Sequence, residues 1–214
     1  MTLKVNFINN YKKKGTFYEI VFVKDFKIKN ADLSRIFQFA KNHPLFCEDL
    51  FYQKENKNIT YIFVNCNNIE LSNDYEKIGS MLFDYLNKNK IENSNIQLKN
   101  NNLNYMQVER IVHGAKLKSY DFEIYKSSKK KNNTINIDVL GANKNSSIQL
   151  RKKLSSITEG VFFTRDLVLE PPNVLSTDEY VKKLLSLKKI GIKINVLDEK
   201  KNDEVRYEFI IGCW

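Results

Sequence analysis

The stretch Phe17-Tyr-Glu-Ile-Val-Phe-Val23 decides the fold class of this 214-residue chain. Its apolar side chains do not alternate with polar ones, as they would in a strand with one face in water. The stretch therefore predicts a strand that is buried on both faces. A second run of this kind spans residues 59–66 (ITYIFVNC). Such strands belong to sheets that carry helices on both sides, so the two runs predict an α/β protein.

Further strand and helix patterns surround these two runs. Short runs rich in β-forming residues predict three more strands, at residues 3–7, 95–98 and 134–140. Apolar residues at helical spacing predict helices at Asp32–Lys41 and Tyr105–Leu117. This alternation of strands and helices favours a largely parallel or mixed sheet with helices layered on it.

A third helix is predicted after the strand at 59–66. Asn73 lies three residues before Glu76, which is the spacing of a capping box. The residues that follow place apolar side chains on one helix face, at Ile78, Leu82, Tyr85 and Leu86. Polar, Asn- and Lys-rich loops are predicted at residues 100–104 and 126–133.

The last third of the chain predicts a long helix over about 146–169. An apolar stripe at helical spacing marks its buried face: Leu150, Leu154, Ile157, Val161 and Val168. Pro171-Pro172 ends this helix, because the residue before a proline disfavours the α region. Ser176 and Glu179 have the capping-box spacing and open a second helix, which Gly191 is placed to end.

A strand is predicted next, because Ile192, Ile194 and Val196 alternate with polar residues. We therefore expect three parts. An N-terminal α/β domain occupies 1–145, a connecting helix occupies 146–170, and residues 171–214 form an incomplete first helix–strand unit of a second α/β domain.

The composition excludes several classes of protein. Hydrophobic residues make up 42% of the chain and aromatic residues 12%, which is enough to bury a core. Three cysteines without C-x-x-C spacing do not form a disulfide framework. No apolar run approaches the roughly 20 residues that span a bilayer, and the N-terminus lacks the apolar segment of a signal peptide. We expect a cytoplasmic protein without a membrane partner.

The net charge of +10 could indicate a nucleic-acid binder. However, only five of the 35 basic residues are Arg, the residue that phosphate and base recognition favours. Asn is about as common as Lys, in runs such as Asn100–Asn102 and Lys129–Lys131. An A/T-rich genome gives the same composition without any nucleic-acid partner, and we favour that interpretation.

One basic segment keeps both interpretations open. Lys126–Lys131 lies beside three aromatic residues, a mixture that single-strand binders use; these are Tyr120, Phe122 and Tyr125. A solvated loop beside a strand explains the same pattern.

The usual catalytic signatures are missing, including G-x-G-x-x-G, the P-loop, G-x-S-x-G and H-E-x-x-H. His43 and His113 have no second ligand at metal-binding spacing, so we expect His113 in packing or on the surface. The adjacent acids Glu48-Asp49 and Asp198-Glu199 point apart and do not form an acid/base pair. Cysteines 47 and 66 are expected to be core thiols.

One constellation is specific, the string FFTRDLVLEPPNVLS at 162–176. It resembles the inter-domain segment of the leucyl aminopeptidase (cytosol aminopeptidase) family, in which a long helix ends in R-D-L-V-N-x-P-P-N. Leu169 replaces the usual Asn of the family. The resemblance implies a structural, inter-domain role for the residues that match the motif, which are Arg165, Asp166, Pro171, Pro172 and Asn173.

The resemblance extends in both directions. Residues 114–126 are similar to the family's G-x-x-L-x-x-Y-x-F-x-x-Y-K, and 207–214 to a weakened G-M-x-x-L-L-G-V-G. The sequence resemblance is clear over about residues 110–200. Over residues 1–100 it is limited to the order of predicted strands and helices. It implies a macro-domain-like N-terminal α/β domain, a connecting helix, and at 171–214 the truncated start of the metallopeptidase catalytic domain.

The family's chemistry uses two divalent metals, Mn or Zn, to hydrolyse peptides at the N-terminus. Its metal-binding motifs, V-G-K-G-x-x-x-D-S-G-G and N-T-D-A-E-G-R, do not occur in the 214 residues. The resemblance therefore assigns no catalytic residue, no metal ligand and no cofactor to this chain. We expect it to be the N-terminal portion of an aminopeptidase, inactive by itself.

Two alternatives stay open. The chain could be a stand-alone, macro-domain-like module that binds nucleotide or nucleic acid, or a structural partner of a complete aminopeptidase. The family is homohexameric, but it assembles mainly through its catalytic domains, so we expect this chain to be monomeric or prone to aggregation. Six apolar residues of 181–196 lack their family partners, and residues from about 171 onward are expected to be loosely held.

Overall fold

The computed structural model describes residues 2–8, 17–25, 31–42, 50–56, 58–67, 69, 71–125, 134–141 and 145–197. Six strands form one sheet in the order β1-β6-β5-β2-β4-β3. Neighbouring strands are parallel except for β3 and β4, which are antiparallel. The strands are β1 (Thr2–Ile8), β2 (Phe17–Val23), β3 (Phe51–Asn56), β4 (Ile59–Asn65), β5 (Asn93–Gln97) and β6 (Thr134–Leu140).

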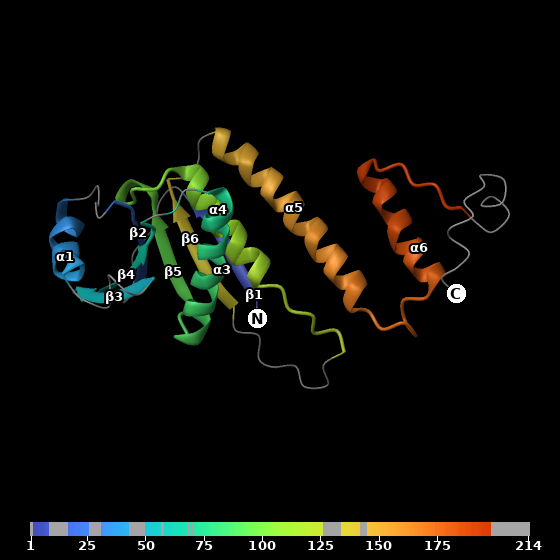
Figure 1. Cartoon of the computed structure of the whole chain (residues 1–214), viewed down its shortest axis with the longest axis horizontal. Helices are drawn as coiled ribbons and strands as arrows, with labels where there is room; N and C mark the ends of the chain where they lie inside the picture. The colour runs from blue at the N-terminus through green and yellow to red at the C-terminus, as the bar shows by residue number, and fades with distance from the viewer. Residues whose placement is uncertain are drawn as a thin grey trace. The chain divides into compact units, whose positions relative to one another are not determined.

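Helices connect and follow these strands (Figure 1). They are α1 (Ala31–Lys41), α3 (Ser72–Lys88), α4 (Tyr105–Lys118), α5 (Asn145–Leu169) and α6 (Thr177–Leu185), with short 3₁₀ turns η1 (Leu98–Asn100) and η2 (Ser186–Ile190). The chain divides into two compact units within α5, between Phe163 and Thr164. The α/β class is confirmed, whereas the domain boundaries at 145 and 170 stay a prediction.

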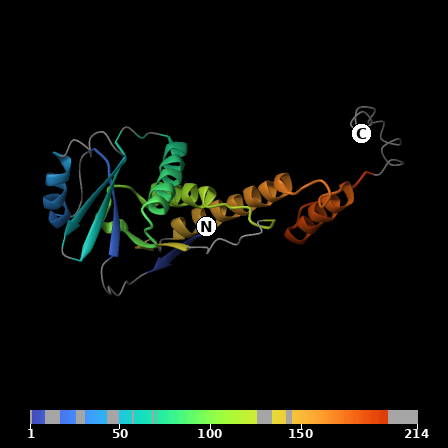
Figure 2. The same ribbon diagram turned by 90° about the horizontal axis from the view of Figure 1, so that it is seen from below.

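The two central runs are buried on both faces, as predicted. On one face, Ile20, Phe22 and Ile62 pack against α3 and α4. On the other face, Val21 and Phe63 pack with residues of α1. Figure 2 shows the strands lying between α1 on one side and α3 and α4 on the other. The expected helices over 32–41, 105–117 and 146–169 are also confirmed, within one residue at each end.

In the first unit the sequence analysis missed one strand, and one of its predicted caps is wrong. The antiparallel edge strand β3 was not expected, because four of its residues, Gln53–Asn56, are polar and exposed. Such polarity protects an edge strand from pairing with other chains. Asn73 and Glu76 form no capping box, since α3 begins at Ser72 and the Asp74 carboxylate accepts the Leu71 N–H at 3.4 Å.

Two predictions for the C-terminal third also fail. Residues 192–197 form no strand, because no neighbouring strand of the described chain supplies main-chain hydrogen bonds. The predicted apolar stripe of α5 is buried only at Leu154, while Ile157 is 42% exposed and Val168 more so. Polar residues take the other buried positions of α5, at Ser147 and Thr158.

The segment Asn100–Asn102, predicted as a loop of merely compositional origin, is part of the sheet's structure. β5 ends at Gln97, so the Phe22 N–H of β2 has no strand partner on that side. The Asn101 carboxamide takes the place of this missing partner. Its oxygen accepts the Phe22 N–H, and its nitrogen donates to the Gln97 carbonyl at 2.7 Å. Asn100 donates to Glu19 at 2.7 Å, and Asn102 to the Lys24 carbonyl at 3.3 Å.

Helices α3 and α4 touch backbone to backbone. A Cβ atom added at Gly79 would lie 1.8 Å from the Ile111 carbonyl oxygen of α4. A Cβ added at Gly114 would lie 1.9 Å from the Glu76 carbonyl oxygen of α3. Only glycine allows this approach, because any other residue carries a Cβ. This contact explains physically why a glycine stands at position 114, where the family-like segment begins.

Gly114→Ala should destabilise the protein by about 3 kcal/mol or more, because the helices must separate to admit the methyl group. Urea unfolding followed by circular dichroism would measure the change. Gly160→Ala is the matched control. Nothing lies within 4 Å of a Cβ at that exposed helical position, so alanine should be neutral or stabilise by up to about 1 kcal/mol. Equal unfolding midpoints for the two variants would contradict the close helix contact.

Asn101→Ala should cost about 1–3 kcal/mol, since it leaves the buried Phe22 N–H without its acceptor. Asn89→Ala is the matched control. The side-chain amide of Asn89 also donates to a main-chain carbonyl, that of Tyr85, but this hydrogen bond is exposed. That control should change the free energy of unfolding by less than about 0.5 kcal/mol. Amide hydrogen exchange at Phe22 gives a local measurement, and unchanged protection in Asn101→Ala would refute the assigned role.

Candidate functional site

The family-motif residues lie at the end of α5 and in the turn before α6. Arg165 and Asp166 are half-buried on the last two turns of α5. The turn is closed by the Pro171 carbonyl, which accepts the N–H groups of Val174 and Leu175 at 2.9 Å each. Pro172 and Asn173 are exposed. The motif thus builds a helix–turn–helix connection, and its inter-domain role stays a prediction.

Glu170 of this segment has a contact that the sequence analysis missed. Its side chain is 7% exposed, and its carboxylate accepts from the Lys183 ammonium of α6 at 2.9 Å. The pair ties the end of α5 to α6 within the second unit. Ser176 accepts the Glu179 N–H at 3.4 Å, which confirms the predicted cap of α6.

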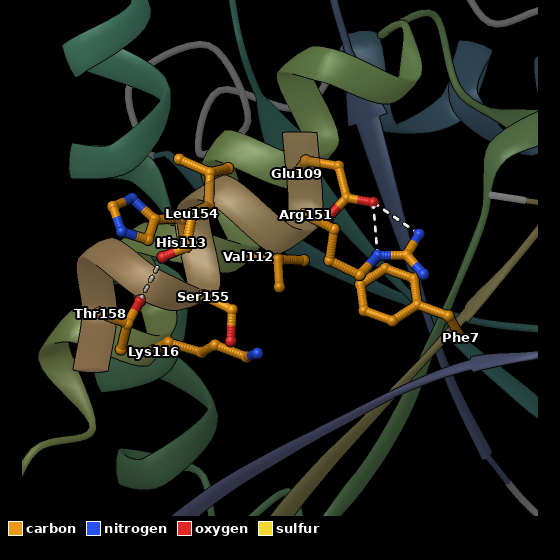
Figure 3. A pocket seen from close by; sticks show the side chains of 9 residues that line it. All are labelled: Phe7, Glu109, Val112, His113, Lys116, Arg151, Leu154, Ser155 and Thr158. Atoms are coloured by element: carbon orange, nitrogen blue, oxygen red, sulfur yellow. Dashed lines mark hydrogen bonds and ion pairs between the residues drawn. The ribbon is translucent and has the colours of Figure 1, made fainter. Parts of the chain in front are cut away.

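A buried polar cluster lies between α4 and α5 in the first unit (Figure 3). Glu109 of α4 is 3% exposed, and one of its oxygens accepts from Arg151 Nη2 at 2.7 Å and Nε at 3.0 Å. Arg151 also donates to the Ser147 hydroxyl at 3.1 Å. Its guanidinium carbon lies 3.2 Å from the centre of the Phe7 ring. These contacts fix α5 against α4 and β1.

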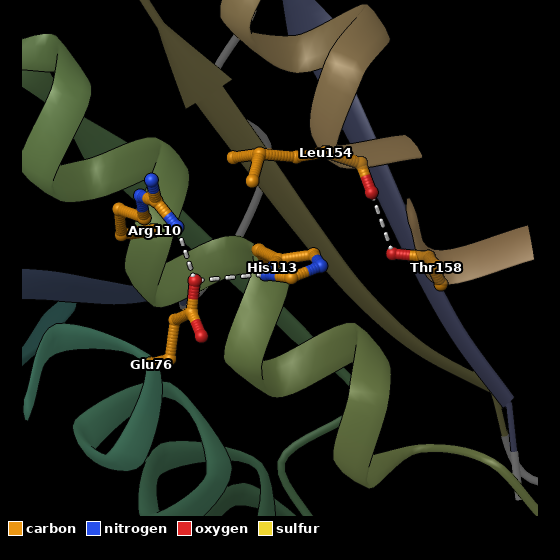
Figure 4. A network of polar contacts seen from close by, with 5 residues as sticks. All are labelled: Glu76, Arg110, His113, Leu154 and Thr158. Carbon is orange, nitrogen blue, oxygen red and sulfur yellow. Dashed lines mark hydrogen bonds and ion pairs between the residues drawn. The ribbon is translucent and has the colours of Figure 1, made fainter. Parts of the chain in front are cut away.

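A second charged group joins α3 and α4 (Figure 4). One Glu76 oxygen accepts from Arg110 Nη1 at 2.7 Å and lies 3.1 Å from His113 Nδ1. His113 is 5% exposed, so it is a packed residue rather than a surface one. Because a carboxylate only accepts, His113 Nδ1 carries a proton and donates.

A small cavity lies beside both groups. It is lined by Phe7, Glu109, Val112, His113, Lys116, Arg151, Leu154, Ser155 and Thr158. Its volume of about 10 Å³ is close to one water-sized sphere. The pocket is partly open to solvent, and its innermost space holds a water-sized sphere. The arrangement therefore holds helices together.

The remaining sequence candidates show no reactive arrangement where they are described. Burial raises the pKa of the Cys66 thiol to about 12, so it stays protonated and unreactive at neutral pH. Tyr120 packs on the Phe162 ring of α5, with ring centres 5.0 Å apart, and Phe122 packs on Tyr125. His43, Cys47, Glu48-Asp49, Lys126–Lys131 and Asp198-Glu199 lie outside the described residues.

The carboxyl ends of β2 and β5 are the place where an open sheet of this kind would take a ligand. The helices that follow these two neighbouring strands, α1 and α4, lie on opposite faces of the sheet, which defines a switch point. Here Asn101 is packed between the strand ends and bonded to main chain on both sides. This filled position gives no support to a nucleotide-binding module.

Neither a metal cluster nor a membrane span is found in the described ranges. These residues contain no group of three or more His, Cys, Asp or Glu side chains that could hold a metal ion. None of their helices is long and apolar enough to cross a membrane. The donor set for a two-metal centre is therefore not present among them, and no catalytic step through a metal is derived for this chain.

Comparison with known proteins gives a consistent result. No protein-family model matches the chain. It is 39% identical to a probable cytosol aminopeptidase of Phytoplasma mali (strain AT), over 46% of this chain and 21% of that protein. It is 33% identical to a probable cytosol aminopeptidase of Rhodopseudomonas palustris (strain TIE-1), over 50% of this chain and 22% of that protein.

The fold has a solved counterpart. A mutant of tomato leucine aminopeptidase matches with a TM-score of 0.70 and 17% identity, over 96% of this chain and 46% of that one. The chain thus spans less than half the length of the aminopeptidases it matches. The resemblance to the leucyl aminopeptidase family is confirmed, and the N-terminal region of such a protein fits the fold. The comparisons do not support the binding-module alternative.

Breaking the Glu109–Arg151 pair should be costly. Arg151→Met should destabilise by about 3 kcal/mol, because it leaves the Glu109 carboxylate buried without its cation. Adding Glu109→Leu in the same chain should recover most of this loss, since no charge then remains buried. Lys118→Met is the control: it breaks an ion pair with Asp84 that is exposed on both sides and should cost less than about 1 kcal/mol.

Thermal or urea unfolding measures these variants, and Glu109→Leu alone completes the double-mutant cycle. If the double variant is no more stable than Arg151→Met alone, the loss does not come from an unpaired Glu109.

Proposed function

We propose that this chain serves as the N-terminal domain of a cytosol (leucyl) aminopeptidase, a metal-dependent hydrolase that removes N-terminal amino acids from peptides. The observation that carries the proposal is the double match. Identity of 39% to a named cytosol aminopeptidase coincides with a TM-score of 0.70 to a leucine aminopeptidase structure. The helix end with Arg165-Asp166 and the Pro171-Pro172-Asn173 turn adds the family's own motif.

In this proposal the chain contributes structure and not chemistry. Its sequence lacks both metal-binding motifs of the family, and its described residues offer no metal-binding group. The two divalent metals of the family, Mn or Zn, would belong to a catalytic domain that this chain does not supply. Peptides become its substrates only when that domain is present, and the isolated chain is inactive.

The partners follow from the same proposal. The protein acts in the cytoplasm, with neither a membrane nor a nucleic acid as partner. Because the family assembles its hexamer mainly through catalytic domains, the isolated chain is a monomer or aggregates. Half-buried and exposed apolar residues of the second unit agree with this, since α6 has no buried residue.

We expect no release of leucine from leucine p-nitroanilide by the pure 214-residue protein, with or without added Mn²⁺ or Zn²⁺. A chimaera in which residues 1–173 replace the N-terminal part of the Phytoplasma mali aminopeptidase, up to its own helix–turn motif, should regain metal-dependent hydrolysis. The chimaera is designed to keep that enzyme's metal-binding part, and the two proteins are 39% identical over 104 residues.

The catalytic part of the same relative, expressed alone, is the control for what the N-terminal domain adds. Metal-dependent turnover by the 214-residue protein would disprove that the chain is inactive. A folded hexameric chimaera that holds its metals and yet has no activity would count against the proposed domain role.

A further inference from the structure

One ring nitrogen of the buried His113 has no hydrogen-bond partner among the described residues. His113 Nδ1 faces Glu76, whereas the other ring nitrogen, Nε2, is buried without a hydrogen-bond partner among the described residues. An unpaired buried polar atom carries a large desolvation cost, so native proteins almost always supply it with a partner or an ordered water. Figure 4 shows this ring nitrogen on the side of Leu154 and Thr158 of α5, away from Glu76.

The space beside His113 is polar and small. It is the cavity between α4 and α5, which the hydroxyls of Thr158 and Ser155 and the side chain of Lys116 also line (Figure 3). Thr158 Oγ1 donates to the Leu154 carbonyl at 2.9 Å, so its lone pairs remain able to accept. The cavity therefore offers two acceptors, His113 Nε2 and Thr158 Oγ1, to a ligand that can donate twice.

The size of the cavity decides the class of ligand. Its innermost space of about 10 Å³, beside His113, corresponds to a single water-sized sphere, whereas a phosphate or an organic molecule would have to extend toward solvent. A metal ion would need several close ligands, and this site has only one imidazole. Arg151 is already bound to Glu109 and does not turn the cavity into an anion site.

We propose that this cavity is a specific site for one buried water molecule, which donates to His113 Nε2 and to Thr158 Oγ1. The water completes a hydrogen-bond chain from Glu76 of α3, through His113 of α4, to Thr158 of α5. It is a third link between α4 and α5, besides the Glu109–Arg151 pair and the buried Leu154. In this arrangement His113 is neutral and carries its proton on Nδ1.

The test uses the full 214-residue protein. A crystal structure should show one water within about 3 Å of both His113 Nε2 and Thr158 Oγ1. A long-range ¹H–¹⁵N spectrum at pH 8 should assign the proton of His113 to Nδ1. An empty cavity at a resolution where other ordered waters are visible, or a proton on Nε2, would overturn the proposal.

Thr158→Val keeps the shape of the side chain but removes one partner of the water. It should lower Tm by about 2–4 °C and shift the ¹⁵N resonance of His113 Nε2, the nucleus that the water contacts. Thr164→Val is the control, because it makes the same change at an exposed position of α5. An Nε2 resonance that stays the same in folded Thr158→Val would show that no water bridges the two residues.

Discussion

The contact of α3 with α4 at Gly79 and Gly114 is the constraint on which the rest of the first unit depends. The two backbones approach so closely that a methyl group at either glycine would overlap a carbonyl oxygen of the other helix. This approach brings Glu76 of α3 within reach of the α4 side chains Arg110 and His113. It also sets the rotation of α4, because the face carrying Gly114 must lie on α3. Glu109 is then buried toward α5, and Arg151 must be present to pair with it.

Helix α5 is consequently held by directional polar contacts more than by apolar area. Leu154 is its only fully buried apolar residue in the described chain, at 4% exposed, while Ser147 and Thr158 are buried on the same side. A helix packed through an apolar face can shift by one turn along its neighbour. A helix whose Arg is bound to a single buried carboxylate cannot, because the ion pair would break. A buried ion pair adds little net stability compared with well-packed apolar residues, so its contribution here is the position of the helix along α4.

The sequence predicted the elements whose identity depends on local pattern. Phe17–Val23 and the run at 59–66 are uniformly apolar, and their burial on two faces follows from that alone. The features it did not predict depend on partners distant in the chain. β3 is polar because it lies at an edge, and its only signal was Phe51-Tyr52 before Gln53. The alternation at 192–196 was strand-like, but a strand also needs a neighbour, which a local pattern cannot report.

The polar clusters were the hardest part to predict, for the same reason. Asn101 stands in a run of three Asn that codon bias explains equally well, and only the end of β5 beside Phe22 shows its role. For His113 the sequence left packing and surface positions open, and the structure places it in packing, at 5% exposed. Its pairing with Glu76 spans 37 positions and leaves no sequence signal.

The buried carboxylates of the described helices already have cationic partners. A metal centre needs carboxylates whose oxygens are free to turn toward the ion. Here the buried or half-buried Glu residues on α3 and α4, and the one that follows α5, are each bound by a cation of their own unit: Glu76 by Arg110, Glu109 by Arg151 and Glu170 by Lys183. If any of these carboxylates turned away toward a metal ion, the positive charge of its Arg or Lys partner would be left uncompensated. Their charges therefore hold the helices of each unit in place.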